Sequence, residues 1–494
     1  MDEILEEAVA ELAAGIARGG VIAAAGCGKT EQIVNATLVS AGRRLILTHT
    51  HAGVDALRWR MDKKLVPKSR YRIETIAGWC LRYAASFPAR SGIHIAAPRT
   101  DADWQSIYDA TVKLLDAGTV TNVLRASYGG LFVDEYQDCT QSQHKVIDAL
   151  AQILPTCVFG DPMQAIFSFG GQVPVSWDAD VFPSFPKITV LQKPHRWLRE
   201  GNKELADWLS VVRFKLEAGE SVDLEQRPAC VDWQALPADA AYHRPKIVGS
   251  CKALLGPAAN DGIIVIADAK NAGSRSGLAK MLGASGFTNI EPVECTTLAA
   301  AVRNIGKSSG EQRLEFVMGF ISDCMTGAEE TPYLKAVVSH RQGGKLGQKK
   351  FGDLIATGIA TVKNEDLASV LALMEGFRDR PATTLYRREM YHAMASGLRL
   401  AINSPGKSLS DAIWDVQNRI RQHAGRIIPK RSIGSTLLVK GLQFDRAVIV
   451  ANDAMNGKDW YVALTRASKG VTILSTAPKI HPAVQAAQLG EAAE

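Results

Sequence analysis

The stretch AAAGCGKT, from Ala23 to Thr30, decides the fold of this 494-residue chain. It follows the apolar run GGVIAA, which reads as a buried strand, and it opens a helical pattern. The stretch fits the phosphate-loop pattern except that Ala23 replaces the first glycine. Gly26 and Gly28 let backbone N–H groups approach phosphate oxygens, and the following helix adds the positive end of its dipole. We therefore predict a nucleoside-triphosphate site in an α/β domain.

The side chains of this loop predict contacts with a triphosphate and its metal ion. Lys29 would reach the β- and γ-phosphates, and Thr30 would supply a hydroxyl to Mg²⁺. A glycine-rich turn capped by Thr30 is the alternative, but the strand–loop–helix context favours the phosphate loop. ATP and Mg²⁺ are therefore the expected cofactors. The other loop residues that would hold the nucleotide are Ala25, Gly26, Cys27 and Gly28.

A second motif, LFVDEYQD from Leu131 to Asp138, places carboxylates at the end of another apolar run. Asp134 would hold Mg²⁺ through water, and Glu135 would polarise the water that attacks the γ-phosphate. An acidic pair after a strand is by itself weak evidence, since it also occurs as a plain polar strand end. Here Gln137 and Asp138 follow at the spacing of the DExQD box, which favours the catalytic interpretation.

Composition and charge exclude several classes of protein. Hydrophobic residues make up 46% of the chain and charged residues 22%, which is typical of a globular protein, and the length requires several domains. No apolar run reaches the roughly 18 residues of a membrane span, and the acidic start MDEILEEAVAEL is unlike a signal peptide. The eight cysteines form no CxxC pair, which argues against a zinc or iron–sulfur site. We expect a cytoplasmic protein with reduced thiols and no membrane partner.

Apolar runs alternate with helical patterns along most of the chain. RRLILTHT, GGLFVDE, TCVFGD, GIIVIAD and RAVIVAND predict buried strands, whereas ADWQSIYDATVKLLDAG and DLASVLALMEGFRD predict helices. Strands separated by helices indicate parallel sheets of the doubly wound type. The strands fall into two groups, residues 20–191 and 262–475, and helical insertions are expected at residues 89–125 and 293–430.

Four further segments complete a set of motifs that resembles the UvrD/Rep-like superfamily 1A DNA helicases. VFGDPMQAIFSF, LQKPHRW, KGLQFD and YVALTRA follow the two motifs above in the family's order. The resemblance implies that Gln164 senses the γ-phosphate, that Arg196 contacts it and that Arg466 is an arginine finger. His195 stands where the family has an adenine-stacking tyrosine, and Gln443 stands where the family has a glutamate that contacts the sugar. These two departures leave strict preference for ATP open.

The resemblance also implies a domain plan. It predicts an α/β fold with two RecA-like, parallel-sheet cores of the phosphate-loop NTPase class and helical insertions, in the 1A, 1B, 2A and 2B arrangement. ATP would bridge the cores, and its hydrolysis would release them, so that repeated closure becomes movement along a strand. The expected parts are core 1A at 1–88 and 126–195, insertion 1B at 89–125, core 2A at 196–292 and 431–478, insertion 2B at 293–430 and a tail at 479–494.

Contacts with single-stranded nucleic acid are also implied by the resemblance. Phe169 would stack on a base, and Thr48, His49 and Thr75 lie in the motifs that contact the strand. His49 replaces an aromatic residue of the family, so the path and polarity of the strand are less firmly predicted.

Basic stretches extend this prediction, although the net charge of only +6 does not require nucleic acid. The segment Arg58–Arg72 contains seven Lys and Arg residues, among them Arg58 and Arg60, with Trp59 and Tyr71 interleaved. Backbone neutralisation combined with stacking is what single-strand binding needs, and a solvated helix face is the alternative. Two stretches in the second insertion, HRQGGKLGQKK and NRIRQHAGR, are candidates for contact with duplex phosphates or plain solvated surface.

These observations favour an ATP-dependent helicase or translocase that moves on single-stranded DNA, with 3′-to-5′ polarity implied by the resemblance alone. A translocase that does not separate strands is one alternative. An ATP-hydrolysing, DNA-sensing subunit of a nuclease complex is another, and an RNA helicase stays open. A small nucleotide kinase is excluded because it would not need the DExQD and YVALTRA motifs.

A protein partner is suggested by size and by the drift of the strand-contacting motifs. The chain is compact beside full-length UvrD-like enzymes, and its overall plan is similar to the helicase subunit of the Gabija anti-phage system. In that family the helicase works with an OLD-type nuclease. A stand-alone helicase, either for DNA repair or borne on a plasmid, is the alternative.

Overall fold

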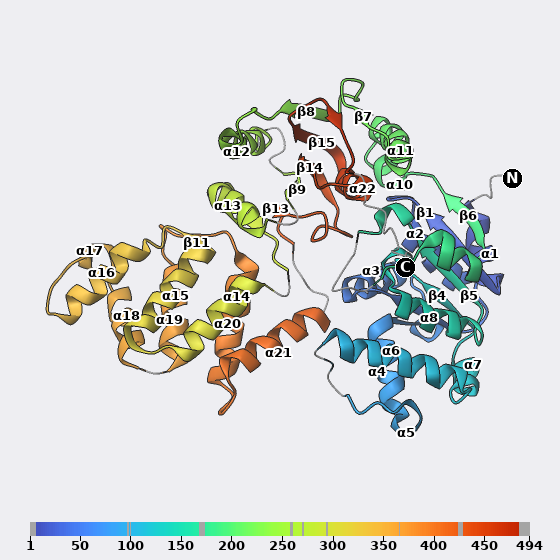
Figure 1. The fold of residues 1–494 in the computed structure, drawn as a ribbon, viewed down its shortest axis with the longest axis horizontal. Helices are drawn as coiled ribbons and strands as arrows, with labels where there is room; N and C mark the ends of the chain where they lie inside the picture. The colour runs from blue at the N-terminus through green and yellow to red at the C-terminus, as the bar shows by residue number, and fades with distance from the viewer. Residues whose placement is uncertain are drawn as a thin grey trace, which may run out of the picture. The chain divides into compact units, whose positions relative to one another are not determined.

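The computed structural model describes residues 6–95, 98, 100–166, 173–256, 260–268, 271–292, 295–364, 366–422 and 428–483 (Figure 1). The chain forms two compact units, each built around its own sheet. Unit 1 comprises Met1–Val222, Asp453–Lys469 and His481–Glu494, and unit 2 comprises Asp223–Asn452 and Gly470–Ile480.

Unit 1 contains a six-stranded sheet in the order β3-β2-β4-β5-β1-β6, and its neighbouring strands run parallel. The central strands β2, β4 and β5 are buried along their whole length, because helices cover both faces of the sheet. This explains why they read as continuous apolar runs. The strands are β1 (Arg18–Ala23), β2 (Arg44–Thr48), β3 (Tyr71–Thr75), β4 (Gly130–Val133), β5 (Thr156–Gly160) and β6 (Lys187–Leu191).

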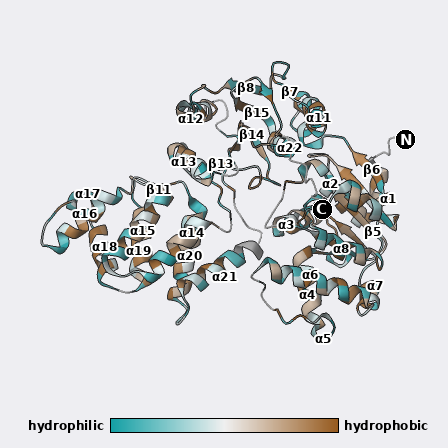
Figure 2. Ribbon diagram, viewed as in Figure 1, coloured by the Kyte–Doolittle hydropathy of each residue, from teal (hydrophilic) through white to brown (hydrophobic). Residues whose placement is uncertain are grey.

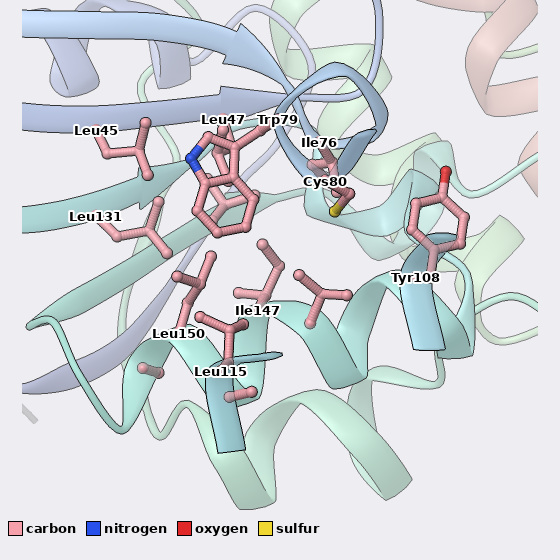
Figure 3. Packing of buried hydrophobic residues seen from close by; sticks show 14 of the residues in the cluster. Leu45, Leu47, Ile76, Trp79, Cys80, Tyr108, Leu115, Leu131, Ile147 and Leu150 are labelled. Carbon is pink, nitrogen blue, oxygen red and sulfur yellow. The ribbon is translucent and has the colours of Figure 1, made fainter. Parts of the chain in front are cut away.

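The two faces of this sheet have separate hydrophobic cores. On one face Trp79 is fully buried between Leu45, Leu131 and Leu150 (Figure 3). The helices that contribute to this core are α4 (Ile76–Ser86), α6 (Asp101–Asp116), α7 (Thr121–Ser127) and α8 (Gln141–Ala151), and the short α5 (Pro88–Ser91) and α9 (Phe182–Ser184) lie beside them. The other face is covered by α1 (Glu6–Gly15), α2 (Lys29–Val39) and α3 (His51–Lys63).

Three described helices of unit 1 come wholly or mainly from the segments predicted for core 2A. They are α10 (His195–Arg199), α11 (Lys203–Glu217) and α22 (Gly457–Leu464). Helix α22 packs against α11 and against the 3-10 turn Pro162–Gln164. The compact units therefore differ from the predicted boundaries, since residues 196–222 and 453–469 pack with the phosphate-loop sheet.

Unit 2 contains the second six-stranded sheet, in the order β10-β13-β9-β14-β15-β8. The pairs β10–β13, β13–β9, β9–β14 and β15–β8 run parallel. The strands are β8 (Val231–Ala235), β9 (Ile263–Ile266), β10 (Thr288–Asn289), β13 (Arg431–Gly434), β14 (Phe444–Val450) and β15 (Ala467–Ser475), and α12 (His243–Ala253) and α13 (Ala272–Leu282) pack beside them. The edge pair β7 (Val222–Asp223) and β16 (Lys479–Ile480) forms a separate two-stranded sheet.

The stretch expected to form the second insertion is helical and has a hydrophobic core of its own. Its helices are amphipathic, and the ribbon alternates between hydrophobic and hydrophilic residues along them (Figure 2). They are α14 (Thr296–Lys307), α15 (Gly310–Cys324), α16 (Glu330–Arg341), α17 (Gln348–Phe351), α18 (Leu354–Lys363), α19 (Leu367–Arg378), α20 (Arg388–Ile402) and α21 (Leu409–Gln422), with an antiparallel pair of β11 (Met325–Thr326) and β12 (Thr384–Leu385).

The two parallel sheets confirm the predicted α/β fold class with two RecA-like cores. The finer division into 1A, 1B, 2A and 2B stays a prediction. Among the described residues, no helix combines the length and the apolar character that crossing a membrane requires.

Candidate active site

The phosphate loop leaves β1 at Ala23 and enters α2 at Lys29. Gly26 and Gly28 both adopt positive φ, at 75° and 82°, which is the left-handed region that favours glycine. Space is also limited, because a Cβ atom on Gly26 would lie 2.8 Å from the ring of Trp197. The glycines seen in the sequence are therefore required both by backbone conformation and by the packing of α10 against the loop.

Backbone groups of the loop are held by residues distant in sequence. The N–H group of Arg196 donates to the carbonyl oxygen of Gly26 over 3.2 Å. The N–H group of Ala25 donates to the hydroxyl of Tyr461 over 3.0 Å. Cys27 is buried beside these contacts, and His195 approaches Gly28, where an added Cβ would lie 3.3 Å from the imidazole. The loop is thus fastened to α10 and α22.

Three charged side chains meet at the end of β4. The ammonium of Lys29 lies 2.5 Å from Glu135 Oε2 and 3.6 Å from Asp134 Oδ1. Asp134 follows directly on β4, and its backbone N–H donates to the carbonyl of Leu47 on β2. Glu135 adopts a φ of 56°, which is uncommon for a residue with a side chain and is typical of functional sites.

Burial perturbs the charges of this cluster in different directions. Burial raises the pKa of Asp134 to about 6, although the charge of Lys29 opposes the shift. Burial of the Lys29 ammonium lowers its pKa, but the nearby carboxylates of Glu135 and Asp134 outweigh this effect, so the pKa lies above its ordinary value. Lys29 therefore stays charged at neutral pH, whereas the Asp134 carboxylate is destabilised and would gain from a cation.

The donor set fits Mg²⁺ held together with a nucleotide. Mg²⁺ is usually bound by one or two protein oxygens, by substrate phosphates and by water. Asp134 offers a buried carboxylate at the end of β4, and Thr30 offers a hydroxyl in the first turn of α2. No group of three or more His, Cys, Asp or Glu side chains suited to a metal occurs among the described residues. The protein part of the site is thus a partial ligand set that phosphate oxygens and water would complete.

Gln137 fixes the position of the acidic motif. Its side-chain amide donates to Glu135 Oε2 over 2.5 Å, and its carbonyl oxygen accepts from the backbone N–H of Asp161 over 3.0 Å. Tyr136, between Glu135 and Gln137, is buried, and its hydroxyl forms a 2.7 Å hydrogen bond with His144 Nδ1. The DExQD spacing therefore corresponds to a bridge between the acidic motif and the segment after β5.

Two guanidinium groups, those of the buried Arg466 and the half-buried Arg196, approach the same region. Arg466 is only 1% exposed, and it donates to the carbonyl of Val462 over 2.9 Å and to Gln164 Oε1 over 3.4 Å. Arg196 donates to the carbonyl of Thr465. Burial lowers the pKa of Arg466 to about 9 and that of Arg196 to about 10. The charge of Arg196 also lowers the pKa of Arg466, and the charges of Arg199 and Arg60 lower the pKa of Arg196. A phosphate group placed here would offset this cost.

The structure thus brings together most side chains that the sequence predicted for ATP chemistry. Hydrogen bonds connect the two ends of this set. Gln137 donates to Glu135 and accepts from the backbone of Asp161. The Asp161 carboxylate accepts from Gln164, whose carbonyl oxygen accepts from Arg466. Gln443 is the exception, because it is an exposed residue of unit 2 and its contact with a sugar stays a prediction. The catalytic candidates that lie in unit 1 are Lys29, Asp134, Glu135, Gln164, Arg196 and Arg466.

The residues predicted to contact nucleic acid are placed less favourably. Thr48 is fully buried at the end of β2. The hydroxyl of Thr75 caps α4 by accepting from the N–H of Gly78 over 3.0 Å. His49 is half-buried, and Phe169 lies outside the described residues. A role of these four residues in binding nucleic acid stays a prediction.

The basic segment Arg58–Arg72 is largely paired within the protein. Arg58 lies 3.5 Å from Asp55, Lys64 lies 2.5 Å from Glu31, and Arg72 lies 2.7 Å from Glu74. Arg70 donates to the carbonyls of Leu38 and Ser40. These partners weaken the case for a continuous phosphate-tracking segment.

The aromatic residues of that segment differ from each other. Tyr71 is 8% exposed and belongs to the core, so the prediction that it is available for stacking is wrong. It starts β3, and its side chain faces α3 because alternate strand residues point inward. Trp59 is 61% exposed, and the ammonium of Lys63 lies 5.1 Å from its ring centroid. Arg60 is half-buried in the last turn of α3, and its role in binding nucleic acid stays a prediction.

Some residues of the site were missed by sequence reasoning. Asp161 and Tyr461 lie inside motifs that were quoted, but nothing in the sequence assigned them a contact. Arg213 lies outside all of the motifs. The only sequence signal for Arg213 is its spacing on α11, four residues after the buried Leu209. This spacing places a charged side chain on the apolar face of the helix, where it needs a partner.

One family model matches a part of the chain that contributes to this site. Residues 95–175 match the family model of the UvrD/REP helicase N-terminal domain, and this range contains the acidic motif and Gln164. The match supports a superfamily 1 helicase. No curated protein matches the sequence.

Solved structures of a viral helicase show a distant similarity. The complex of Arterivirus nonstructural protein 10 (helicase) with DNA has a TM-score of 0.35 and 10% sequence identity, and it covers 94% of this chain and 62% of the viral chain. The crystal structure of the same helicase gives a TM-score of 0.35, 10% identity, 94% of this chain and 61% of the viral chain. The chain thus spans about three-fifths of the length of these viral chains.

Proposed function

We propose that this chain is a Mg²⁺- and ATP-dependent UvrD-like helicase or translocase that moves on single-stranded DNA with 3′-to-5′ polarity. The observation that carries the proposal is the arrangement beside the phosphate loop, where the half-buried Glu135 contacts Lys29. Hydrogen bonds through Gln137, Asp161 and Gln164 connect Glu135 to the buried Arg466. Phosphoryl transfer needs a cation on the phosphates, a positioned base and a second cation on the developing charge. Lys29, Glu135 and Arg466 each have the chemistry for one of these tasks.

The residues would divide the hydrolysis step as follows. Backbone N–H groups of the loop and the ammonium of Lys29 would bind phosphate oxygens, and Thr30 and Asp134 would hold Mg²⁺, whose charge would offset that of the phosphates. Glu135 orients a water molecule and accepts its proton as the oxygen attacks the γ-phosphorus. The bond to the β,γ-bridging oxygen breaks, and ADP and inorganic phosphate are the products. Arg466 donates to the γ-phosphate oxygens as their charge develops.

The 2.5 Å contact between Lys29 and Glu135 sets the order of events. A triphosphate carries more negative charge than one carboxylate, so it would compete with Glu135 for the ammonium. Glu135 would then turn toward the water while Gln137 continues to hold one of its oxygens. The exchange of partners would make Glu135 available as a base only when the phosphates are in place.

The assignment to a motor rather than to a simple nucleotide hydrolase is supported by the family match and by the two RecA-like sheets. Movement on a strand would use unit 1 for ATP chemistry and both units for the nucleic acid. Exposed cations of the α16–α17 region, Lys345 and Lys349, are candidates for duplex phosphates.

A second candidate function is an ATP-hydrolysing, DNA-sensing subunit of a nuclease complex without strong unwinding of its own. The pairing of Arg58, Lys64 and Arg72 within the protein favours it, since few cations of that segment are left for a strand. The partner would be an OLD-type nuclease, as in Gabija-type anti-phage systems. DNA repair is the alternative setting for a stand-alone helicase.

The testing experiment measures ATP turnover with and without single-stranded DNA or RNA, followed by strand displacement on duplexes with a 3′ or a 5′ tail. The proposal predicts turnover that DNA stimulates and displacement of the 3′-tailed duplex. Stimulated turnover without displacement would favour the DNA-sensing subunit, and light scattering with a candidate nuclease would then test for the complex. Turnover that no nucleic acid changes would exclude both functions.

A further inference from the structure

Arg213 on α11 holds the most buried carboxylate of the segment after β5. Its guanidinium donates to Asp161 through both terminal nitrogens, with distances of 2.7 Å from Nη2 to Oδ1 and 3.0 Å from Nη1 to Oδ2. Asp161 is 0% exposed. A two-pronged contact of this kind fixes orientation as well as distance, and lysine cannot reproduce it. The pair is therefore a rigid joint between α11 and the turn that carries Gln164.

The same guanidinium also contacts α22. Its Cζ atom lies 4.9 Å from the centroid of the Tyr461 ring, and the Tyr461 hydroxyl accepts the hydrogen bond from the phosphate-loop N–H of Ala25. Burial, together with the Asp161 carboxylate, raises the pKa of Tyr461, so the hydroxyl stays protonated. Arg213 thus touches a residue that is itself bonded to the phosphate loop.

The path continues from Asp161 to the predicted arginine finger. Asp161 Oδ2 accepts from the side-chain amide of Gln164 over 2.9 Å, which leaves the Gln164 carbonyl oxygen to accept from Arg466 Nη2. The amide of Gln164 is oriented by this pair of contacts, because its nitrogen faces the carboxylate and its oxygen faces the guanidinium. Movement of Asp161 would therefore be passed to both side chains.

We infer that Arg213 is a positioning residue that links the phosphate loop, through Tyr461, to the γ-phosphate contacts Gln164 and Arg466, through Asp161. The inference rests on the proposed function. Arg213 does not touch the nucleotide in this scheme. It keeps the two ends of the site in register, so that Gln164 and Arg466 meet the γ-phosphate in a fixed orientation.

A purely structural role would also explain a buried arginine, so the test must separate the two. In the positioning role, Arg213→Lys keeps a cation for the Tyr461 ring but loses the two-pronged contact with Asp161, so it should weaken interactions with the γ-phosphate rather than with the phosphate loop. The affinity for ADP should stay within about two-fold of wild type, while a non-hydrolysable ATP analogue binds several-fold more weakly and kcat falls about ten-fold or more. Lys203→Gln is the matched control, because Lys203 lies on the same helix with a side chain that is 75% exposed.

A mutant cycle gives the second readout. If Arg213 acts through Gln164 and Arg466, adding Arg213→Lys to the variant Gln164→Ala/Arg466→Ala should not slow turnover further. Independent structural damage would instead give losses that multiply. Each variant is compared by thermal unfolding. Should Arg213→Lys fail to fold, Arg213→Gln/Asp161→Asn removes both buried charges together, which is often tolerated, and it carries the same readouts.

The outcomes are distinguishable. The inference is supported if Arg213→Lys weakens binding of the ATP analogue but not of ADP, and if its loss in kcat does not multiply with the loss caused by removing the γ-phosphate contacts. Equal weakening of ADP and the analogue, multiplying losses, or variants that match Lys203→Gln overturn it while the proposed function stands. Absence of turnover and nucleotide binding in the wild-type chain overturns the proposed function, and the inference with it.

Discussion

The ammonium of Lys29, in the phosphate loop, lies 2.5 Å from the carboxylate of Glu135, just beyond the end of β4. In the proposed cycle these two groups must separate, since the cation belongs to the phosphates and the carboxylate belongs to the attacking water. The pair is thus the element that couples triphosphate binding to activation of the base.

Lys29→Ala should abolish hydrolysis and weaken triphosphate binding, because phosphate charge is left uncompensated. The loss in turnover should be about 100-fold or more, as for other single electrostatic groups in active sites. Turnover is measured at saturating ATP, and binding with a fluorescent nucleotide. Lys203→Gln is the control, and a Lys29→Ala enzyme that retained more than about a tenth of wild-type turnover would exclude the assigned role.

Glu135→Gln should separate binding from chemistry. The amide keeps the shape of the carboxylate but cannot accept the proton of water, so ATP should bind and persist. Lys29 also loses its carboxylate partner at 2.5 Å, and triphosphate affinity should therefore rise. Rapid-filtration binding and single-turnover hydrolysis measure the two effects, with Asp207→Asn on the exposed face of α11 as control. Normal single-turnover rates would mean that another residue is the base.

The loop, the acidic motif and the strands were predictable because each depends on local sequence. Gly26 and Gly28 adopt the positive φ that the phosphate-loop pattern requires, and the apolar runs became buried strands because helices cover both faces of the sheets. The order of the motifs then indicated the residues that converge at the carboxyl ends of the strands.

The connections between motifs were not predictable from local patterns. The hydrogen bond from Ala25 to Tyr461 joins residues 436 positions apart, and the Arg213–Asp161 pair depends on how α11 packs. Tyr71 shows the same limit. The composition of the segment Arg58–Arg72 suggested a basic and aromatic surface, but the position of Tyr71 in β3 directs its ring into the core. Periodicity predicts which face is buried only after the partner element is known.

Hydrolysis should fall as pH decreases through about 6, the pKa to which burial raises Asp134. Mg²⁺ needs the carboxylate, so protons and the metal compete for it. Raising the Mg²⁺ concentration should shift the midpoint to lower pH. Initial rates between about pH 5 and about pH 8 at two Mg²⁺ concentrations measure this. A midpoint that does not respond to Mg²⁺ would assign the titration to a different group.

The same pKa makes a prediction about stability. Because the folded-state pKa of Asp134 lies above its unfolded value, protonation stabilises the fold, and this contribution is lost as pH rises through about 6. Asp134→Asn stays neutral, so it should raise the unfolding temperature at about pH 8 and change it little at about pH 3, below both pKa values. Asp207→Asn serves as the exposed control. A less stable Asp134→Asn at the higher pH would show that attraction to Lys29 outweighs burial.

Trp59→Ala should weaken binding of single-stranded DNA, because the ring is 61% exposed beside the ammonium of Lys63. Stacking of one base contributes about 1–3 kcal/mol, so the affinity should fall by about five-fold or more. Fluorescence anisotropy with a labelled oligonucleotide measures it. Phe214→Ala is the matched control, since Phe214 is an aromatic residue of unit 1 that is 78% exposed on α11. Equal effects of the two substitutions would contradict a specific stacking role for Trp59.

The salt dependence of binding should distinguish free cations of the basic segment from paired ones. Lys63 and Lys68 are exposed, whereas Arg72 lies 2.7 Å from Glu74. Each phosphate contact on a single strand contributes about −0.7 to the slope of log K against log salt. Lys63→Gln/Lys68→Gln should therefore flatten the slope by about 1.4 if both lysines contact phosphates, and Arg72→Gln, the control, should leave it nearly unchanged. An unchanged slope in the double variant would assign the segment to solvated surface, because a strand bound elsewhere would not register the loss of either lysine.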